Sequence, residues 1–139
     1  GTGSGVLALA AAALGVGRVH AIDTDPCAVF EARRNIRRND LAKRITVAQG
    51  GLELFKQGYD MIIANLRAPT LMDLRHLVQK TNAGWTALVF SGLKDDEVAA
   101  LCRLYREAGF RLHRKLVEKG WGAVCLIRAP LVGDGAGPI

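Results

Sequence analysis

The chain has 139 residues, a mass of 14.9 kDa and a formal net charge of +6; 50% of its residues are hydrophobic and 23% are charged. This composition excludes a disordered chain, and the length suits one domain whose core needs no disulfide or metal cross-links. No apolar run reaches the roughly 18 residues of a membrane-spanning helix, and no secretory signal opens the chain, so a cytoplasmic protein without a membrane partner is expected.

The cysteines, the histidines and the positive charge are only weak indicators of function. The three cysteines form no Cys-x-x-Cys pair and are interpreted as small buried thiols in a reducing compartment. The three histidines are scattered, so no metal site is predicted. Much of the positive charge lies in one segment, whose basic residues are Arg33, Arg34, Arg37, Arg38, Lys43 and Arg44. No aromatic residue interleaves them for base stacking, so a solvated helix face is favoured over direct RNA contact.

The predicted elements alternate between helices and strands along the whole chain. The first helix spans 4–15 and ends at Gly15. Its expected buried stripe consists of Val6, Leu9, Ala10, Ala13 and Leu14. A short buried strand over 18–23 follows. Asp25 then caps a second helix with Pro26 at its first position, where a missing N–H costs nothing.

The middle of the chain continues this alternation. The second helix has an apolar stripe of Val29, Ala32 and Ile36. Strands are predicted over 44–48 and 59–64, and the latter is apolar on both faces, as a central parallel strand should be. The next helix is marked by Leu71, Leu74 and Val78. A strand over 85–91 then precedes a helix that Asp95 or Asp96 opens, with apolar positions at Val98, Leu101, Tyr105 and Ala108.

Gly109 ends that helix, and two strands over 110–117 and 122–128 follow it. The turn at Lys119-Gly120 is too short for a parallel crossover, so this last pair is expected to be antiparallel. The whole pattern therefore predicts an α/β fold: a doubly wound, mostly parallel sheet covered on both faces, with an antiparallel final strand.

One strand of that sheet is missing from the pattern. A glycine-rich loop that enters the first helix should follow the first, central strand of the sheet, and no strand precedes Gly1. The expected organisation is one domain over 1–130, cut after its first strand, and a flexible tail over 131–139. The strands on either side of the missing one would expose unpaired backbone groups, so the chain is expected to aggregate or fold loosely.

The opening Gly-x-Gly-x-Gly loop suggests a nucleotide site. A dinucleotide fingerprint needs a small residue at position 6, where this chain has Val6, so a dinucleotide-dependent oxidoreductase is disfavoured. Asp23 lies 20 residues beyond Gly3 (23 − 3) at the end of the next strand, where an acid can accept hydrogen bonds from ribose hydroxyls. A nucleoside without a pyrophosphate indicates S-adenosylmethionine. Its adenine is expected near Gly50-Gly51-Leu52, where small residues leave room for a flat base.

With these motifs, the chain resembles class I methyltransferases. The segments GTGSGVLALAAAALG, AIDTDP, QGGL, YDMIIANL, SGLKDDE, REAGF and KGWGAV occur in order. Together they are similar to the enzymes that methylate ribosomal large-subunit protein eleven, the PrmA type. The resemblance implies that Gly1, Thr2 and Gly3 line the methionine part of the cofactor. It implies that Asp23 binds the ribose and that Gly50, Gly51 and Leu52 lie by the adenine. Asn65 would both contact the cofactor and stand beside the reactive methyl as the catalytic residue.

This chain departs from the family pattern in three places. It has Gly51 where the family often has serine, and Arg67 where an apolar or aromatic residue often follows Asn-Leu. It also contains neither the acidic end of the first strand nor the N-terminal domain that recognises the substrate protein. Asn65 is followed by Leu66 rather than by Pro-Pro-Tyr, which argues against a flipped nucleobase as substrate.

The implied reaction is methyl transfer from a sulfonium to an amine of a ribosomal large-subunit protein, either a lysine or the N-terminal amine. The amine must first lose its proton, and a dry pocket favours that loss. No carboxylate–histidine pair in the sequence demands a general base, so Asn65 is expected only to orient the amine. Two alternatives stay open: a different acceptor, such as a small amine or RNA, and a truncated fragment that binds the cofactor without turnover.

Overall fold

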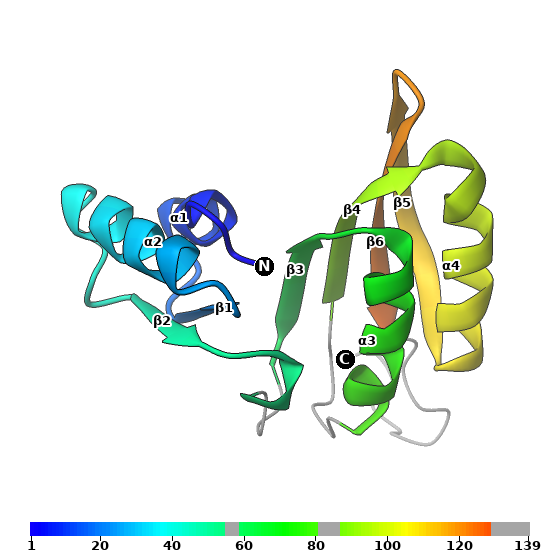
Figure 1. The fold of residues 1–139 in the computed structure, drawn as a ribbon. Coiled ribbons are helices and arrows are strands. Elements are labelled where there is room, and N and C mark those ends of the chain that lie inside the picture. The colour runs from blue at the N-terminus through cyan, green and yellow to red at the C-terminus, as the bar shows by residue number, and fades with distance from the viewer. Residues whose placement is uncertain (55–58, 81–86, 129–139) are drawn as a thin grey trace, which may run out of the picture. The chain divides into compact units, whose positions relative to one another are not determined.

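The computed structural model describes residues 1–54, 59–80 and 87–128 (Figure 1). The chain divides into two compact units, Gly1–Lys56 and Gln57–Ile139, each with its own sheet. Helices and strands alternate as the sequence pattern predicts until the final antiparallel pair. The predicted tail over 131–139 lies outside the described residues, as do positions 85 and 86 of a predicted strand.

The first unit is a two-stranded parallel sheet with two helices on one face. Its elements are α1 (Val6–Ala13), β1 (Val19–Asp23), α2 (Pro26–Arg38), β2 (Ile45–Gln49) and the short 3-10 helix η1 (Leu52–Leu54). The strands pair in register from Val19 opposite Ile45 to Asp23 opposite Gln49. The buried residues of one sheet face and both helices form a single core: Ala8, Ala12, Ala21, Val29, Ala32, Ile36, Ile45 and Val47.

The second helix, α2, forms as its sequence predicts. The Asp25 carboxylate accepts a hydrogen bond from the Cys27 N–H at 2.8 Å, which caps the helix, and Pro26 is its first residue. The three predicted core residues of α2 are all buried. A short turn capped by Asp25 therefore joins the end of β1 to the start of α2.

The predicted buried stripe of α1 is wrong. Val6 is 61% exposed and Leu14 is 87% exposed, whereas the buried residues are Ala8, Ala11 and Ala12. The helix sequence VLALAAAA has no polar residue, so its periodicity cannot indicate which side faces the core. Close packing selects the side with small residues, because a Cβ added to Gly5 would lie 3.2 Å from the Ala32 Cβ. Little space therefore remains between α1 and α2 for larger side chains.

The basic segment is only partly a solvated face. Arg33 donates to the Val47 carbonyl at 2.8 Å, and Arg44 donates to the Val16 carbonyl at 2.7 Å. Arg34 pairs with Glu31 on the surface of α2. Half of the six basic side chains of this segment thus have partners within the first unit, and two of them hold backbone carbonyls in place.

The second unit is a four-stranded mixed sheet. Its elements are β3 (Met61–Asn65), α3 (Ala68–Lys80), β4 (Ala87–Lys94), α4 (Asp95–Glu107), β5 (Phe110–Glu118) and β6 (Trp121–Arg128). The strand order is β3-β4-β6-β5, with β3 and β4 parallel and both β4–β6 and β5–β6 antiparallel, which confirms the expected antiparallel end of the chain. The two-residue turn at Lys119 and Gly120 joins β5 to β6, and both residues have positive φ, as a tight hairpin turn requires.

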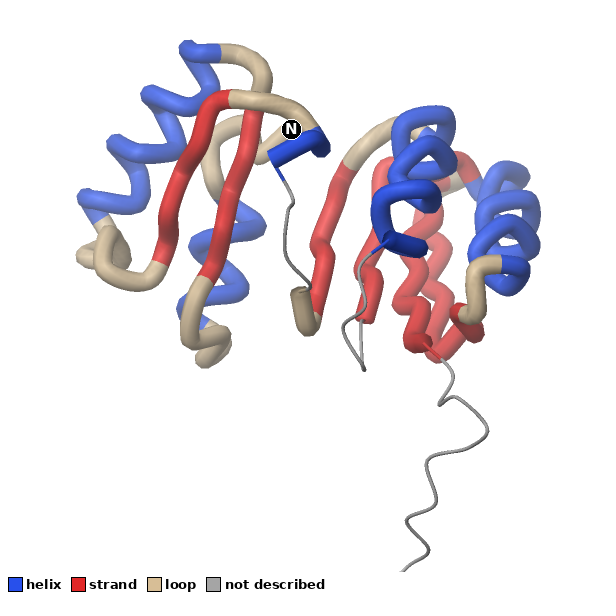
Figure 2. The backbone as a smooth tube through the Cα atoms, turned by 90° about the horizontal axis from the view of Figure 1, so that it is seen from below, coloured by secondary structure: helices blue, strands red, loops and turns tan. Residues whose placement is uncertain are grey.

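Helices α3 and α4 cover one face of this sheet (Figure 2). Its core residues include Leu71, Leu74, Val78, Leu88, Phe90, Leu101, Tyr105, Phe110, Val124 and Leu126. Tyr105 packs edge-on against Phe90 and Phe110, and its hydroxyl donates to the Leu71 carbonyl at 2.7 Å. That bond satisfies the only polar atom of the Tyr105 side chain and ties α4 to α3.

Two local predictions differ from the structure, and a third is confirmed. Strand β4 runs on to Lys94, three residues beyond the predicted end. Helix α4 begins at Asp95, as predicted, and the Glu97 carboxylate accepts the Lys94 N–H at 2.7 Å. The cysteines are not all buried, since Cys27 is exposed and the other two are half-buried. Among the described helices, none is both long and apolar enough to span a membrane.

Strand β3 lies at an open edge of the sheet in its unit, as the sequence predicts for a strand beside the missing one. Within the described residues it pairs with β4 alone, as β1 pairs with β2 alone. Met61 is 45% exposed and Ile63 is 37% exposed, so one face of β3 presents apolar side chains beside an open backbone edge. An exposed apolar edge of this kind is a template for pairing with another chain.

We therefore expect the 139-residue chain to self-associate through β3. Met61→Lys places a charge on the open strand and should shift the sedimentation profile toward monomer. Phe30→Lys, at an exposed apolar position of helix α2, where no strand edge is open, is the matched control and should leave the profile unchanged. A wild-type chain that stays monomeric and unfolds cooperatively over a wide concentration range would contradict this expectation.

Candidate functional site

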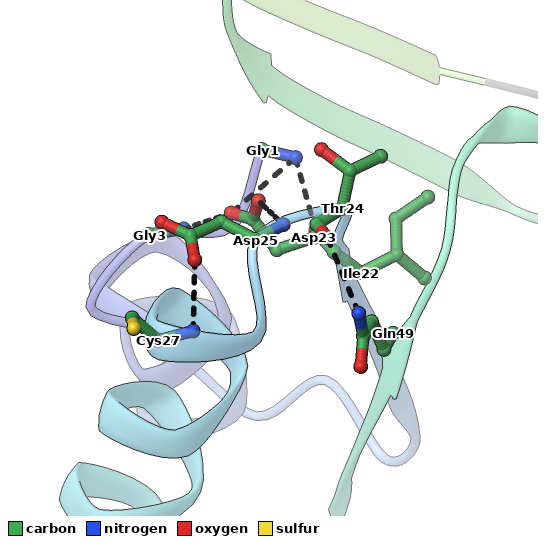
Figure 3. Close-up of polar contacts among 8 residues, drawn as sticks. All are labelled: Gly1, Gly3, Ile22, Asp23, Thr24, Asp25, Cys27 and Gln49. Carbon is green, nitrogen blue, oxygen red and sulfur yellow. Dashed lines mark hydrogen bonds and ion pairs between the residues drawn. The ribbon is translucent and has the colours of Figure 1, made fainter.

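The Asp23 carboxylate is the centre of the polar contacts at the end of β1 (Figure 3). One oxygen, Oδ2, accepts the Gly3 N–H at 2.8 Å, and the other, Oδ1, accepts the Asp25 N–H at 3.1 Å. The residue is only 7% exposed. One carboxylate therefore holds together the loop before α1 and the turn before α2.

The loop before α1 lies against the end of the same strand. The N–H groups of Gly1 and Thr2 both donate to the Ile22 carbonyl, at 3.1 and 2.8 Å. Gly3 and Gly5 have φ values of 55° and 83°, which favour glycine. Among the described residues, no atom lies within 4 Å of the position that a Cβ on Gly3 would occupy. The loop thus presents bare backbone to open space beside a buried carboxylate.

The electrostatics of Asp23 keep it ionised. Burial raises the pKa of its carboxyl, but the hydrogen bonds from the Gly3 and Asp25 N–H groups hold that pKa below its usual value. An ionised carboxylate is purely an acceptor and has about four lone-pair positions. Two backbone donors leave capacity for two more, which is what a pair of neighbouring hydroxyl groups needs. The residues present therefore fit a ribose.

The Gly50-Gly51 segment adjoins this cluster. The Gly50 N–H donates to the Asp23 carbonyl at 2.8 Å, which places the end of β2 beside the end of β1. The Glu53 carboxylate accepts the Gly51 N–H at 2.7 Å. A Cβ added to Gly50 would lie 2.6 Å from Leu54 Cδ1, so side-chain ends fill part of the space at these glycines. A flat base would bind here only after the flexible Glu53 and Leu54 side chains move aside.

Asn65 belongs to the second unit and is the last residue of β3. It lies opposite Ser91 of β4 in the parallel pairing, and its side chain is exposed. The next residue, Leu66, donates its N–H to the Ser91 carbonyl at 3.2 Å, which holds the chain against β4 just beyond the strand. The predicted residues thus form one cluster in the first unit, and Asn65 stands at the carboxyl end of a parallel strand in the second.

Sequence reasoning missed three contributors to this geometry. It assigned Asp25 only to the helix cap, whereas the Asp25 N–H also binds Asp23. It assigned no role to Glu53, whose carboxylate accepts a hydrogen bond from the N–H of Gly51, two residues earlier in the chain. It also passed over Gly92, although the Ser-Gly-Leu-Lys motif includes it. No local sequence signal marks Glu53, whereas the glycine in the middle of an apolar strand pattern could have been noticed.

These elements are those of a class I methyltransferase fold. The chain superposes on a ribosomal protein L11 methylase from Lactobacillus delbrueckii subsp. bulgaricus with a TM-score of 0.83 and 27% identity, covering 91% of this chain and 65% of that one. A human methyltransferase 10 domain containing protein shares the fold, with a TM-score of 0.70 at 19% identity, over 93% of this chain and 68% of that one.

The sequence matches are more specific than the fold. The ribosomal protein L11 methyltransferase (PrmA) family matches residues 1–129, and the chain belongs to this family. The ribosomal protein L11 methyltransferase of Methylococcus capsulatus is 35% identical over 92% of this chain and 43% of its own length. That of Gloeobacter violaceus is 37% identical over 91% and 40%. The chain therefore spans about two fifths of the length of these relatives.

The lowered pKa of Asp23 predicts a pH dependence of stability. A carboxyl with a lowered folded-state pKa stabilises the fold above its unfolded pKa of about 3.9, and this contribution is lost as pH falls through the folded value. Asp23→Asn should remove that contribution at neutral pH and flatten the acid limb of the stability curve. Urea unfolding followed by far-UV circular dichroism, between about pH 7 and about pH 3, measures both curves.

The exposed Glu31, which pairs only with Arg34 in the described contacts, provides the control Glu31→Gln. This variant should follow the wild-type curve, because exposed ion pairs contribute little. Parallel acid limbs for wild type and Asp23→Asn would show that Asp23 does not control the acid sensitivity.

Proposed function

We propose that this chain is the S-adenosylmethionine-binding part of a methyltransferase that modifies amines of a ribosomal large-subunit protein. Its family supports the reaction, and the names of its relatives support ribosomal protein L11 as the acceptor. The observation that carries the cofactor assignment is the buried, ionised Asp23 carboxylate beside a glycine loop with open space in front of it. We further propose that residues 1–130 act as one cofactor-binding domain in the cytoplasm, where ribosomal proteins are made.

In this proposal the first unit binds the cofactor. Gly1, Thr2 and Gly3 contact its methionine part through backbone groups that no side chain shields. The free lone pairs of Asp23 accept the two ribose hydroxyls, and the backbone bonds from Gly3 and Asp25 keep the carboxylate from turning away. The segment Gly50-Gly51-Leu52 would lie along the adenine, with the Glu53 side chain displaced.

The second unit would orient the acceptor amine. S-adenosylmethionine, when bound, supplies an electrophilic methyl group on a sulfonium. Asn65 would contact the cofactor and accept a hydrogen bond from the acceptor amine through its carboxamide oxygen, which orients the nitrogen lone pair. Such alignment alone can contribute roughly 7–11 kcal/mol to lowering a barrier. The amine must arrive neutral, and exclusion of water from the site would lower the pKa of a lysine acceptor.

Asp23 can be tested by binding alone. Asp23→Asn should weaken binding of S-adenosylhomocysteine by about 1.5–3 kcal/mol, the usual contribution of a hydrogen bond to a charged group. Isothermal titration calorimetry measures the change. Asp25→Ala is the control: it removes the α2 cap and costs about 1 kcal/mol of stability, but it keeps the Asp25 N–H and should keep the affinity. Unchanged affinity in a folded Asp23→Asn variant would remove Asp23 from the site.

Asn65 can be tested by separating turnover from binding. Asn65→Ala should lower the rate of methyl transfer from S-adenosylmethionine to purified ribosomal protein L11 by about 10- to 100-fold, the effect of misaligned reactants. Its affinity for S-adenosylhomocysteine should change much less, because the lost contact acts mainly in the transition state. The exposed α3 residue Gln79 gives the control Gln79→Ala, with wild-type turnover expected. Equal losses of affinity and turnover in Asn65→Ala would instead indicate a structural turn.

A further inference from the structure

Gly92 interrupts β4 at the position next to Asn65 on the neighbouring strand. The pairing of β4 with β6 shifts its register between Phe90 and Leu93, and Gly92 lies within this irregularity. Its φ is 82°, a left-handed conformation that favours glycine. Irregularities of this kind in a strand re-aim the side chains around them and occur often next to active sites.

The backbone beyond β3 passes very close to Gly92. A Cβ added to Gly92 would lie 2.8 Å from Asn65 Oδ1, 2.8 Å from the Leu66 carbonyl oxygen and 3.2 Å from the Leu66 nitrogen. Two of these three atoms belong to the backbone, which is held in place because the Leu66 N–H donates to the Ser91 carbonyl. A side chain at position 92 would therefore displace both the Asn65 carboxamide and the Leu66 backbone just beyond β3.

Conformation alone does not distinguish Gly92 from other glycines of the chain. Gly109 and Gly120 have φ values of 85° and 80°, close to that of Gly92. Within the described structure, a Cβ on either of them would meet no atom within 4 Å. Gly92 differs from both because a Cβ at position 92 would lie 2.8 Å from the side-chain oxygen of Asn65. The chain thus contains glycines of similar φ, with and without such a neighbour.

We propose that Gly92 is a positioning residue, which sets the orientation of the Asn65 carboxamide by allowing it to lie against the backbone of β4. The proposal rests on the proposed function insofar as Asn65 orients the acceptor amine. Any side chain at position 92 would turn the carboxamide away from that orientation, while the cluster around Asp23, in the other unit, would keep its hydrogen bonds. Gly92 would therefore affect methyl transfer much more than cofactor binding.

The first experiment compares Gly92→Ala with Gly109→Ala, which carries the same φ strain without the contact. Gly92→Ala should lower the turnover on ribosomal protein L11 by about 10- to 100-fold, as Asn65→Ala does, with a much smaller change in affinity for S-adenosylhomocysteine. Gly109→Ala should keep wild-type turnover. In the double variant of Asn65→Ala and Gly92→Ala, the combined loss should be smaller than additive, because both substitutions act through the Asn65 side chain. Additive losses, or equal losses in both glycine variants, would overturn the proposal.

The second experiment needs no cofactor or substrate. In the unsubstituted protein, a nuclear Overhauser contact is expected between the Gly92 α-protons and the Asn65 side-chain amide. The Asn65 side-chain amide resonances should shift in Gly92→Ala and stay in place in Gly109→Ala. Absence of the Overhauser contact would overturn the proposal even if Gly92→Ala failed to fold. Full turnover by Asn65→Ala would instead refute the assigned role of Asn65 and leave the physical contact with Gly92 intact.

Discussion

The hydrogen bonds of the Asp23 carboxylate are the constraint on which the first unit depends. Each oxygen accepts one backbone N–H, from Gly3 on one side and Asp25 on the other. The loop that would contact a ligand and the turn that starts α2 are therefore held by one ionised group at the end of β1. Because an ionised carboxylate only accepts, the same contacts that organise the loop also preserve the charge that a ribose would meet. Local folding and ligand binding thus depend on the same side chain.

The second unit is held together mainly by apolar packing. Its core is apolar, and the buried hydroxyl of Tyr105 is satisfied by the Leu71 carbonyl. Arg128 of β6 also donates to the Val78 carbonyl of α3 at 3.2 Å. This packing fixes α3 and α4 on one face of the sheet, and the parallel pairing of β3 with β4 then places Asn65 beside Ser91. The carboxyl ends of parallel strands are where ligands bind in such sheets. The position of Asn65 therefore follows from strand pairing, and its orientation follows from what lies next to it.

The sequence predicts best where polar and apolar residues alternate clearly. Asp25 and Pro26 mark the start of α2, and its buried residues follow the helical period, because its outer face is strongly charged. The same reasoning fails for α1, where Val6 and Leu14 lie outside the core, since an all-apolar helix gives no contrast between faces. For β3, apolar residues on both faces indicate an interior strand, and one of its edges is open in the described structure, as expected beside the missing strand. Hydrophobicity indicates that a strand tends to be buried, but it does not supply the neighbour that buries it.

Close backbone approach is the part of this structure that composition and periodicity cannot show. Gly5 leaves room for Ala32 between the two helices, and Gly122 leaves room for Val98 under α4. At Gly92 the neighbouring atoms are instead the Asn65 side-chain oxygen and the backbone of Leu66. In the first two cases the absent side chain permits core packing, so a substitution would be expected to cost stability. At Gly92 the absent side chain permits the Asn65 carboxamide to lie in one orientation, so a substitution would be expected to impair the function of Asn65.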